Sequence, residues 1–162
     1  MICILESVLV PQNRLNVIKD GPVKSKIEKE LNVKLEFNEN VVNIEGEGVE
    51  LMQAKTIVKA IGRGFSPKKA FRLFDEDVFL EIREIEGKDN KIKLIRSRLI
   101  GSGGKTRKMI ERFSGCSVSV YGKTVCIIGT YEQMNIAREA IDMILRGSKH
   151  SKVYGFLLRA KS

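Results

Sequence analysis

The chain has 162 residues, 43% of them hydrophobic, and a mean hydropathy of −0.13, which excludes a wholly disordered protein and fits one ordinary domain or two small ones. No run of apolar residues approaches the roughly 18 that a membrane span needs, and residues 1–6 lack the pattern of a secretory signal, so we expect neither. With 29 basic and 20 acidic residues the net charge is +9, which favours a polyanionic partner. Three cysteines are too few for a disulfide framework and indicate a reducing compartment, so we expect a cytoplasmic protein.

The first half of the chain is a series of short strands and helices. Stretches rich in β-branched residues predict strands. Apolar residues spaced i, i+3, i+7 and i+10 predict a long helix that lies against a sheet. In chain order the expected elements are a strand over 2–10, a short helix and a glycine-containing turn, a helix over 22–31, strands over 33–37 and 42–45, and a closing helix with Leu51, Ala54, Val58 and Ile61 on its buried face.

A linker is expected in the middle of the chain. A short helix-like stretch over 67–74 leads to three acidic residues, Asp75, Glu76 and Asp77. Neighbouring carboxylates can hold a metal ion, but a solvated turn fits this position better, and we predict no metal site. We therefore divide the chain into a first domain over 1–76 and a second domain over 77–162.

The second half repeats the first at an offset of 83 residues, without a gap over about fifty positions. Gly21 meets Gly104, and Gly46 meets Gly129. An apolar pattern that keeps register over such a length indicates two copies of one module. The expected elements of the second copy are a strand over 78–85, a helix over 92–100, a helix over 105–114, strands over 116–121 and 124–128, and a closing helix with Met134, Ala137, Ile141 and Ile144 on its buried face.

Both copies have the element order β-α-α-β-β-α. The connections 38–41 and 121–123 are so short that they allow only hairpins, and hairpins pair strands antiparallel. We therefore predict an α+β protein of two tandem modules, each a three-stranded antiparallel sheet with three helices packed on one face.

A glycine-rich loop separates two helices of the second copy. It runs Gly101-Ser102-Gly103-Gly104 and is followed by Lys105-Thr106-Arg107-Lys108. Glycines let the backbone turn tightly and approach a ligand, and the first N–H groups of the next helix favour an anion such as phosphate. A plain helix-turn-helix with a glycine cap is the alternative, but such a cap needs one glycine and this loop has three.

The end of this loop also matches a nucleotide-binding P-loop. That motif needs a glycine where the chain has Leu99, and it needs a strand where residues 92–100 predict a helix. We therefore reject a P-loop.

The sequence Ile100-Gly101-x-x-Gly104 between two helices, within β-α-α-β-β-α, resembles a type I KH domain. The G-x-x-G loop of that family clamps the backbone of about four single-stranded nucleotides against a groove. The chain departs from the family at Arg107, where an apolar residue is common. The resemblance implies an RNA site formed by Ile100, Gly101, Ser102, Gly103, Gly104, Lys105, Thr106, Arg107, Lys108, Ile110, Val118 and Ile127, with the last three in the groove that receives bases, and auxiliary contacts from Arg96, Arg98, Lys152 and Tyr154.

A second motif makes the resemblance more specific. Leu145-Arg146-Gly147-Ser148 with Ser151-Lys152-Val153-Tyr154-Gly155 resembles the ribosome-assembly KH proteins called Dim-two or Partner-of-Nob-one, and the likeness covers most of residues 78–159. The resemblance implies a non-enzymatic maturation factor that binds near the 3′ end of small-subunit ribosomal RNA. It also implies the nuclease Nob-one as a partner and, in archaea, the α subunit of initiation factor two. A two-copy chain of this length is similar to the archaeal members.

The first copy lacks the features of an anion site. Ile18 stands where the second copy has its first loop glycine, and Asp20 places a negative charge where a phosphate would lie. Pro22 removes a backbone N–H donor, although proline suits the first turn of a helix. We expect this copy to contribute packing, a protein-binding surface or an auxiliary RNA contact.

The positive charge gathers around the glycine loop. Residues 1–76 hold 12 basic and 11 acidic residues, whereas residues 77–162 hold 17 and 9. The segment from Lys88 to Arg112 alone has nine basic residues against two acidic ones. This distribution favours a single-stranded RNA backbone held by the second copy.

The remaining candidates carry little chemistry. We expect His150 to be solvated or to face a phosphate, and Cys116 and Cys126 to fill the core, without a zinc or other cofactor site. Tyr154 and Phe156 either stack on a base or dock the C-terminal segment onto the sheet. We predict RNA binding; a protein-binding adaptor is the alternative, and no nucleophile–base pair supports an enzyme.

Overall fold

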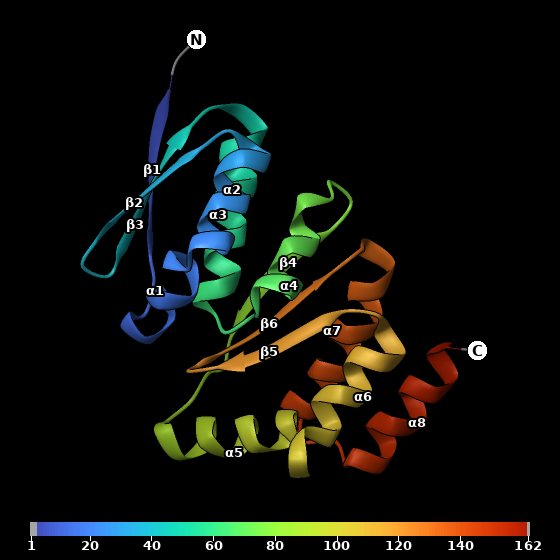
Figure 1. The fold of residues 1–162 in the computed structure, drawn as a ribbon. Coiled ribbons are helices and arrows are strands. Elements are labelled where there is room, and N and C mark those ends of the chain that lie inside the picture. Colours follow the sequence, from blue (N-terminus) through green and yellow to red (C-terminus); the bar gives the residue numbers. More distant parts are fainter. Residues whose placement is uncertain (1–2, 162) are drawn as a thin grey trace. The chain divides into compact units, whose positions relative to one another are not determined.

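A computed structural model describes residues 3–161 (Figure 1). The chain divides into two compact units, the first ending at Asp75 and the second beginning at Glu76. Each unit contains one three-stranded antiparallel sheet and several helices, which confirms the predicted α+β class. No helix in residues 3–161 has the length and apolar character needed to cross a bilayer.

The first unit follows the predicted element order closely. Its sheet has the strand order β1-β3-β2, so the opening strand pairs with the third strand. The predicted short helix-like stretch forms two single turns. In chain order the elements are β1 (Ile4–Leu9), α1 (Gln12–Lys19), α2 (Gly21–Leu31), β2 (Lys34–Asn38), β3 (Val41–Gly46), α3 (Gly48–Gly62), α4 (Pro67–Ala70) and the 3-10 helix η1 (Phe71–Phe74).

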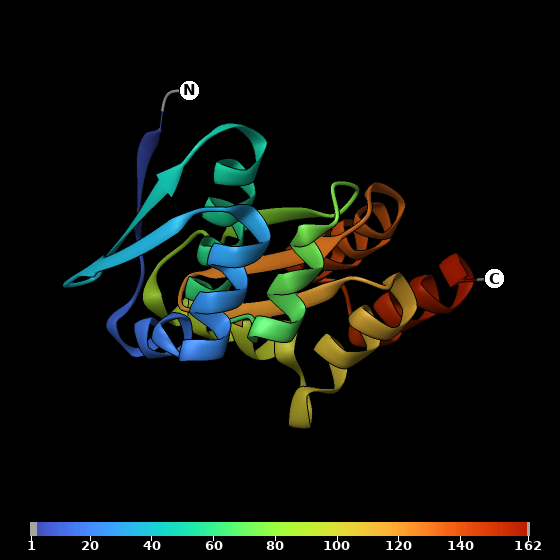
Figure 2. The same ribbon diagram turned by 45° about the horizontal axis from the view of Figure 1, so that its top comes forward.

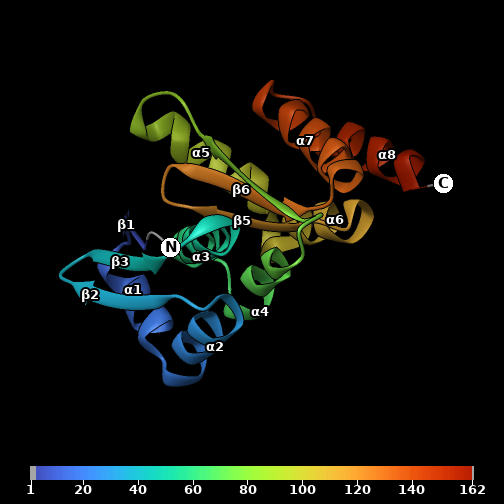
Figure 3. The same ribbon diagram turned by 90° about the horizontal axis from the view of Figure 1, so that it is seen from above.

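The second unit has the same element order with one additional long helix. Its sheet has the matching strand order β4-β6-β5. Figure 3 shows α5, α6 and α7 with the sheet, and α8 lies alongside α7. In chain order the elements are β4 (Phe79–Glu84), α5 (Asp89–Ile100), the 3-10 helix η2 (Ser102–Gly104), α6 (Lys105–Ser114), β5 (Ser117–Tyr121), β6 (Thr124–Gly129), α7 (Tyr131–Leu145) and α8 (His150–Lys161).

The closing helices bury the faces that their apolar spacing predicts. All eight residues of the two predicted faces are at most 5% exposed. The N-terminus of α7 carries a capping box, in which Thr130 and Gln133 satisfy each other's backbone N–H groups. The α7 face forms the core of the second unit together with Leu99 of α5 and Ile110 of α6.

Several close contacts recur in both units at the offset of 83 residues. Gly46 and Gly129 are glycines because an added Cβ would lie 2.7 Å from Val33 Cγ1 and 2.6 Å from Cys116 Sγ, respectively. A further pair of equivalent contacts joins the second helix to the following strand. Leu35 N donates to Glu28 Oε2 in the first unit, and Val118 N donates to Glu111 Oε2 in the second, both at 2.9 Å.

An arginine clamp also recurs, with its register displaced by one residue. Arg14 donates to the carbonyl oxygens of Ile61 and Phe65, at 2.9 and 2.8 Å. In the second unit Arg98 donates to the carbonyl oxygens of Ile144 and Ser148, which are the equivalents of these two residues. The two arginines are 84 positions apart, whereas the carbonyl groups that they bind are 83 apart. The repeat offset therefore changes by one residue in the helix before the loop.

The C-terminal segment differs from one of the two predicted arrangements. It forms α8, which packs on α6 and α7 and not on the sheet (Figure 2). Val153 and Leu157 are fully buried in the core of the second unit, and Phe156 packs against that core. The apolar face of α8 therefore covers α6 and α7 and shields them from solvent.

Candidate nucleic-acid interface

The glycine loop has a backbone conformation that requires glycine at its first position. Gly101, Gly103 and Gly104 all have positive φ, at 74°, 60° and 79°. A Cβ on Gly101 would lie 2.8 Å from the backbone nitrogen of Thr106 and closer still to its hydroxyl. At Gly103, by contrast, no atom lies within 4 Å of an added Cβ, and the residue is exposed. The loop is therefore tightly packed at its base and open at its tip.

The tip of the loop leads directly into the N-terminus of α6. Gly104 is in the left-handed conformation at the N-cap position, and no side chain caps the helix there. The first N–H groups of α6 therefore carry the partial positive charge of an uncapped helix end. Lys105 and Lys108, both exposed, lie in the first turn of this helix. Together these groups form a surface suited to a phosphate.

Two of the residues predicted to contact phosphate or RNA have other partners. Arg107 forms an ion pair with Glu111, with 2.6 Å between its Nη1 and Oε1. Thr106 is fully buried, and its hydroxyl lies 2.9 Å from that of Tyr154. The Thr106 side chain supports the loop from below, and its predicted part in the RNA site stays a prediction. Arg107 keeps its place beside the loop, with its charge shared with Glu111.

The predicted base-binding residues lie within the core. Ile110, Val118 and Ile127 are 0%, 3% and 1% exposed, so they underlie the surface and do not form it. Ile100, at the end of α5, is partly exposed. The position of the three buried residues fits residues that underlie a groove, and the prediction that bases lie in that groove stays a prediction.

Of the four residues predicted to make auxiliary RNA contacts, two have structural partners within the unit and two lie at the surface. Arg98 forms the clamp to Ile144 and Ser148, which gives it a role in packing, and its predicted RNA contact stays a prediction. Tyr154 is half-buried and bonded to Thr106. Lys152 is exposed on α8. Arg96 lies in a surface pocket.

This pocket lies between α5 and the turn that joins β5 to β6, and it encloses about 340 Å³. Lys93, Arg96 and Lys123 supply three cations, and Nε of Arg96 is buried without a hydrogen bond to any described residue. Asp89 is the one acidic residue of the lining and lies 3.9 Å from Lys123. Lys93 and Lys123 are not among the predicted site residues. The spacing of Lys93 and Arg96 places both on one face of α5, but nothing in the sequence brings Lys123 of the β5–β6 turn to that face.

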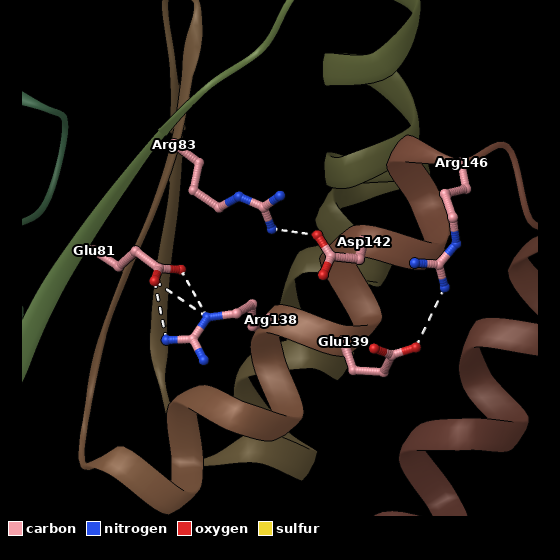
Figure 4. A network of polar contacts seen from close by, with 6 residues as sticks. All are labelled: Glu81, Arg83, Arg138, Glu139, Asp142 and Arg146. Atoms are coloured by element: carbon pink, nitrogen blue, oxygen red, sulfur yellow. Dashed lines mark hydrogen bonds and ion pairs between the residues drawn. The ribbon is translucent and has the colours of Figure 1, made fainter.

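Three other arginines of this unit, Arg83, Arg138 and Arg146, pair with carboxylates (Figure 4). Arg138 forms hydrogen bonds to both oxygens of Glu81, and these bonds raise the pKa of its guanidinium. Arg83 pairs with Asp142, and Arg146 pairs with Glu139. These pairs neutralise charge away from the loop. The net positive charge of the unit lies mainly in the segment that contains α5, the glycine loop and α6, with further basic residues at Lys149, Lys152, Arg159 and Lys161.

The corresponding turn of the first unit shares only the uncapped helix end, since no side chain caps α2. A single residue, Asp20, connects α1 to α2 and is exposed. Gly21 begins α2 without a positive φ, and Ile18 is fully buried. Asp20 places a negative charge near the N-terminus of α2, which disfavours a bound anion there, although its side chain makes no capping hydrogen bond.

The histidine and the two buried cysteines singled out in the sequence do not form a binding site in the structure. His150 lies with Nε2 3.0 Å from the carbonyl oxygen of Arg98 and stacks on Tyr154, so it is not simply solvated. Cys116 and Cys126 are buried, as predicted. Within residues 3–161, no three His, Cys, Asp or Glu side chains come together as metal ligands.

The comparisons with known proteins agree with the resemblance seen in the sequence. The family model of the second KH domain of PNO1, described as a eukaryotic-type KH domain (KH-domain type I), matches residues 78–162. A KH domain-containing protein of Methanocaldococcus jannaschii is 43% identical over 97% of this chain and 74% of that protein. The RNA-binding protein pno-1 of Caenorhabditis briggsae is 30% identical over 93% of this chain, which spans 60% of that protein.

A solved structure extends this agreement to the whole fold. The crystal structure of an a/eIF2alpha-aDim2p-rRNA complex from Pyrococcus horikoshii OT3 contains a chain that is 41% identical to this one. The two chains superpose with a TM-score of 0.89, over 98% of this chain and 94% of that chain.

Proposed function

Because the chain belongs to the KH-domain family that includes PNO1 and Dim2, we propose that it binds single-stranded RNA through its second unit as a non-enzymatic factor in small-subunit maturation. The observation that supports this most directly is the open, uncapped glycine loop at the N-terminus of α6. It combines backbone donors, a partial positive charge and two exposed lysines at one point.

In this proposal the RNA backbone lies across the tip of the loop. Ser102 and Gly103 are exposed, and the absence of side-chain atoms near Gly103 lets a sugar-phosphate chain approach closely. Lys105 and Lys108 neutralise phosphates, because neither side chain forms an ion pair with a described residue in the way that Arg107 does. Bases lie over the surface that Ile110, Val118 and Ile127 support from below.

The pocket between α5 and the β5–β6 turn forms the far end of the same RNA surface. Lys93, Arg96 and Lys123 give it a net positive lining, and Arg96 presents a buried donor that lacks a partner in the described residues. A buried donor without a partner is costly, and a phosphate or base oxygen would satisfy it.

We further propose that the first unit is a second KH domain that has lost its anion site. Its support is the repeated element order, the repeated glycine contacts and the repeated arginine clamp. Asp20 excludes a phosphate from its turn. In our proposal this unit contributes packing and a protein-binding surface, with at most an auxiliary RNA contact.

The proposed target is single-stranded RNA from the 3′ end of small-subunit ribosomal RNA. Support comes from one solved relative, a complex of Dim2 with rRNA and the α subunit of initiation factor two. That α subunit is accordingly a proposed partner of this chain. The nuclease Nob-one is proposed on the family resemblance.

A binding experiment with three RNAs tests this function. The affinity of the full chain is measured for a single-stranded RNA of the 3′-terminal sequence, for the same bases in permuted order, and for a duplex containing the terminal sequence. We expect the terminal single strand to bind tightest and the duplex weakest, because a G-x-x-G clamp holds splayed single strands. Equal binding of single strand and duplex would contradict the KH-type mode.

A second candidate function is that of a protein adaptor, favoured by the near-neutral first unit. The purified α subunit of initiation factor two is titrated with the chain in the absence of RNA. Binding that is independent of RNA and lost on substitution of exposed residues in the first unit supports the adaptor. If RNA binding is then weak for all three RNAs, the adaptor replaces RNA binding as the main function.

A further inference from the structure

Helix α8 contacts the first turn of the helix that follows the glycine loop. The hydroxyl of Tyr154 on α8 lies 2.9 Å from that of Thr106, the second residue of α6. Thr106 is fully buried directly below Gly101, because a Cβ on that glycine would meet both the backbone and the side chain of Thr106. The hydrogen bond therefore lies immediately under the base of the loop.

The same helix also contacts the last turn of the helix that precedes the loop. Nε2 of His150 lies 3.0 Å from the carbonyl oxygen of Arg98, three residues before Gly101. The rings of His150 and Tyr154 stack, with centroids 5.8 Å apart and planes 15° apart. One stacked pair of side chains thus connects α8 to both helices that flank the loop.

Core packing fixes α8 itself in place. Val153 and Leu157, on the face that Tyr154 borders, are fully buried. The Arg98 clamp holds the turn before α8 through the carbonyl oxygens of Ile144 and Ser148. The stacked pair is therefore attached to a rigid element.

The loop has few hydrogen bonds of its own to define its shape. Gly104 N donates to the carbonyl oxygen of Gly101 at 3.1 Å, and three of the four residues have positive φ. A glycine-rich backbone has many alternative conformations, and ordering it costs more entropy than ordering any other residue type. External contacts at both ends of the loop reduce the number of these alternatives.

We propose that Tyr154 is a positioning residue for the glycine loop, holding α6 against α5 through its hydrogen bond to Thr106 and its stacking on His150. This inference rests on the proposed function, because its consequence is a loop ordered for the RNA backbone before RNA binds. Lys105 shares in the arrangement, since its Nζ lies 5.5 Å from the centroid of the Tyr154 ring. RNA then binds without the full entropic cost of ordering the loop.

Two substitutions remove the hydrogen bond from opposite sides. Tyr154→Phe removes one hydroxyl and keeps the stacked ring, and Thr106→Val removes the other and keeps the side-chain shape. We expect each to weaken binding of the 3′-terminal single-stranded RNA about three- to tenfold, and the double variant to lose no more than either single one. Thr106→Ser, which keeps the hydroxyl, should bind within about twofold of the wild type. Tyr131→Phe is the matched control, because Tyr131 is exposed at the start of α7.

A direct contact between Tyr154 and RNA gives a different pattern. In that case Tyr154→Phe weakens binding, Thr106→Val does not, and the effect of the double variant equals that of Tyr154→Phe alone. This result, or wild-type binding by both single variants, overturns the proposal. Truncation of α8 is unsuitable as a test, because it would expose the core around Val153 and Leu157.

Amide hydrogen exchange separates positioning from general stability. We expect faster exchange at Gly101–Gly104 in both single variants and unchanged exchange in β6, whereas a merely structural role would raise exchange across the whole unit. The slope of log affinity against log salt should stay at the wild-type value, because no phosphate contact is removed. Gly103→Asp is tested on the same RNA to separate the two proposals. Wild-type binding by this variant would contradict RNA binding at the loop itself, whereas weakened binding by this variant with wild-type binding by both single variants would contradict only the role of Tyr154.

Discussion

The two units arrange the same pair of helices around very different turns. In the first unit one residue, Asp20, separates α1 from α2. In the second unit Gly101–Gly104 separate α5 from α6, with three positive φ angles and an uncapped helix end. The contacts that hold sheet and helices together recur in both units, whereas the features of an anion site occur in one. This difference separates what the fold requires from what the function requires.

The recurring contacts are those that any copy of the module must make. Gly46 and Gly129 leave room for the residue opposite, and Glu28 and Glu111 each accept a hydrogen bond from the backbone N–H of the second residue of the next strand. None of these contacts depends on the turn between the two helices. The fold of the first unit is therefore compatible with a turn that lacks the loop glycines.

The largest expected effect on RNA affinity comes from placing a negative charge, as Asp20 does in the first unit, in the glycine loop of the second. Gly103→Asp introduces the residue that Asp20 supplies in the first unit, at a position with open space around it but with a φ of 60°, which strains any side chain; Gly103→Asn carries the same strain without the charge and is the reference for this variant. We expect RNA affinity to fall about 100-fold, because a carboxylate lies where a phosphate would bind and removes its charge-assisted hydrogen bonds. Fluorescence anisotropy with the 3′-terminal RNA measures this loss.

The matched control is Gly21→Asp in the first unit. An added Cβ at Gly21 meets nothing within 4 Å, and φ there is not positive. An aspartate in the first turn of α2 suits the helix dipole. Unchanged RNA affinity is expected; a comparable loss in this variant would mean that the first turn also contacts RNA, and the contrast between the units would fail.

Most of the fold could be predicted from the sequence because it depends on local spacing. The helix over 105–114 has the predicted bounds, and the predicted strands lie within two residues of the observed ones. The glycine loop could be recognised for the same reason, since its glycines and cations are consecutive. Its open tip and tight base, at Gly103 and Gly101, follow from backbone angles that the sequence alone does not specify.

The parts that escaped prediction depend on contacts between distant residues. Arg98 resembles a surface cation, and only the fold brings it to two carbonyl oxygens 46 and 50 residues away. Thr106 resembles a loop contact until α8 places Tyr154 against it. The pocket around Arg96 also requires the β5–β6 turn to lie beside α5, which no spacing within α5 reveals.

The arginine clamps provide the next test, because they recur in both units. Arg14→Met and Arg98→Met keep the length of the side chain and remove the hydrogen bonds to backbone carbonyls. We expect each to lower the free energy of unfolding by about 2 kcal/mol, the usual value for hydrogen bonds from a charged donor. Chemical denaturation measures both. A clear effect at Arg98 with none at Arg14 would show that the two clamps are not equivalent.

The salt dependence of RNA binding should respond to lysines of the second unit only. Lys105→Gln with Lys108→Gln removes two proposed phosphate contacts, so the slope of log affinity against log salt should become shallower by about 1.4, at about 0.7 per phosphate of a single strand. Affinity should fall roughly tenfold at physiological salt. Titrations at several salt concentrations give the slope.

Lys24→Gln with Lys29→Gln provides the control for this change in slope. Both lysines lie on α2, which is equivalent to α6, so the double variant removes the same total charge from the first unit. We expect the slope to stay at the wild-type value. An equal change for both double variants would indicate that total charge, and not the glycine loop, sets RNA affinity.

The smallest expected effect concerns an ion pair that joins the opening strand to the closing helix in each unit. Lys55 makes one contact to Glu6, at 3.1 Å, whereas Arg138 contacts both oxygens of Glu81. A guanidinium fork matches a carboxylate better than an ammonium group does, so we expect double-mutant cycles to give about 1 kcal/mol for the arginine pair and about 0.3 kcal/mol for the lysine pair. Both pairs are partly exposed, so both coupling energies should fall in high salt. Neither set of variants should alter RNA affinity, because both pairs lie away from the turn between the first two helices. A change in affinity with the Glu81 pair alone would show that the functional difference between the units extends from the loop to the sheet.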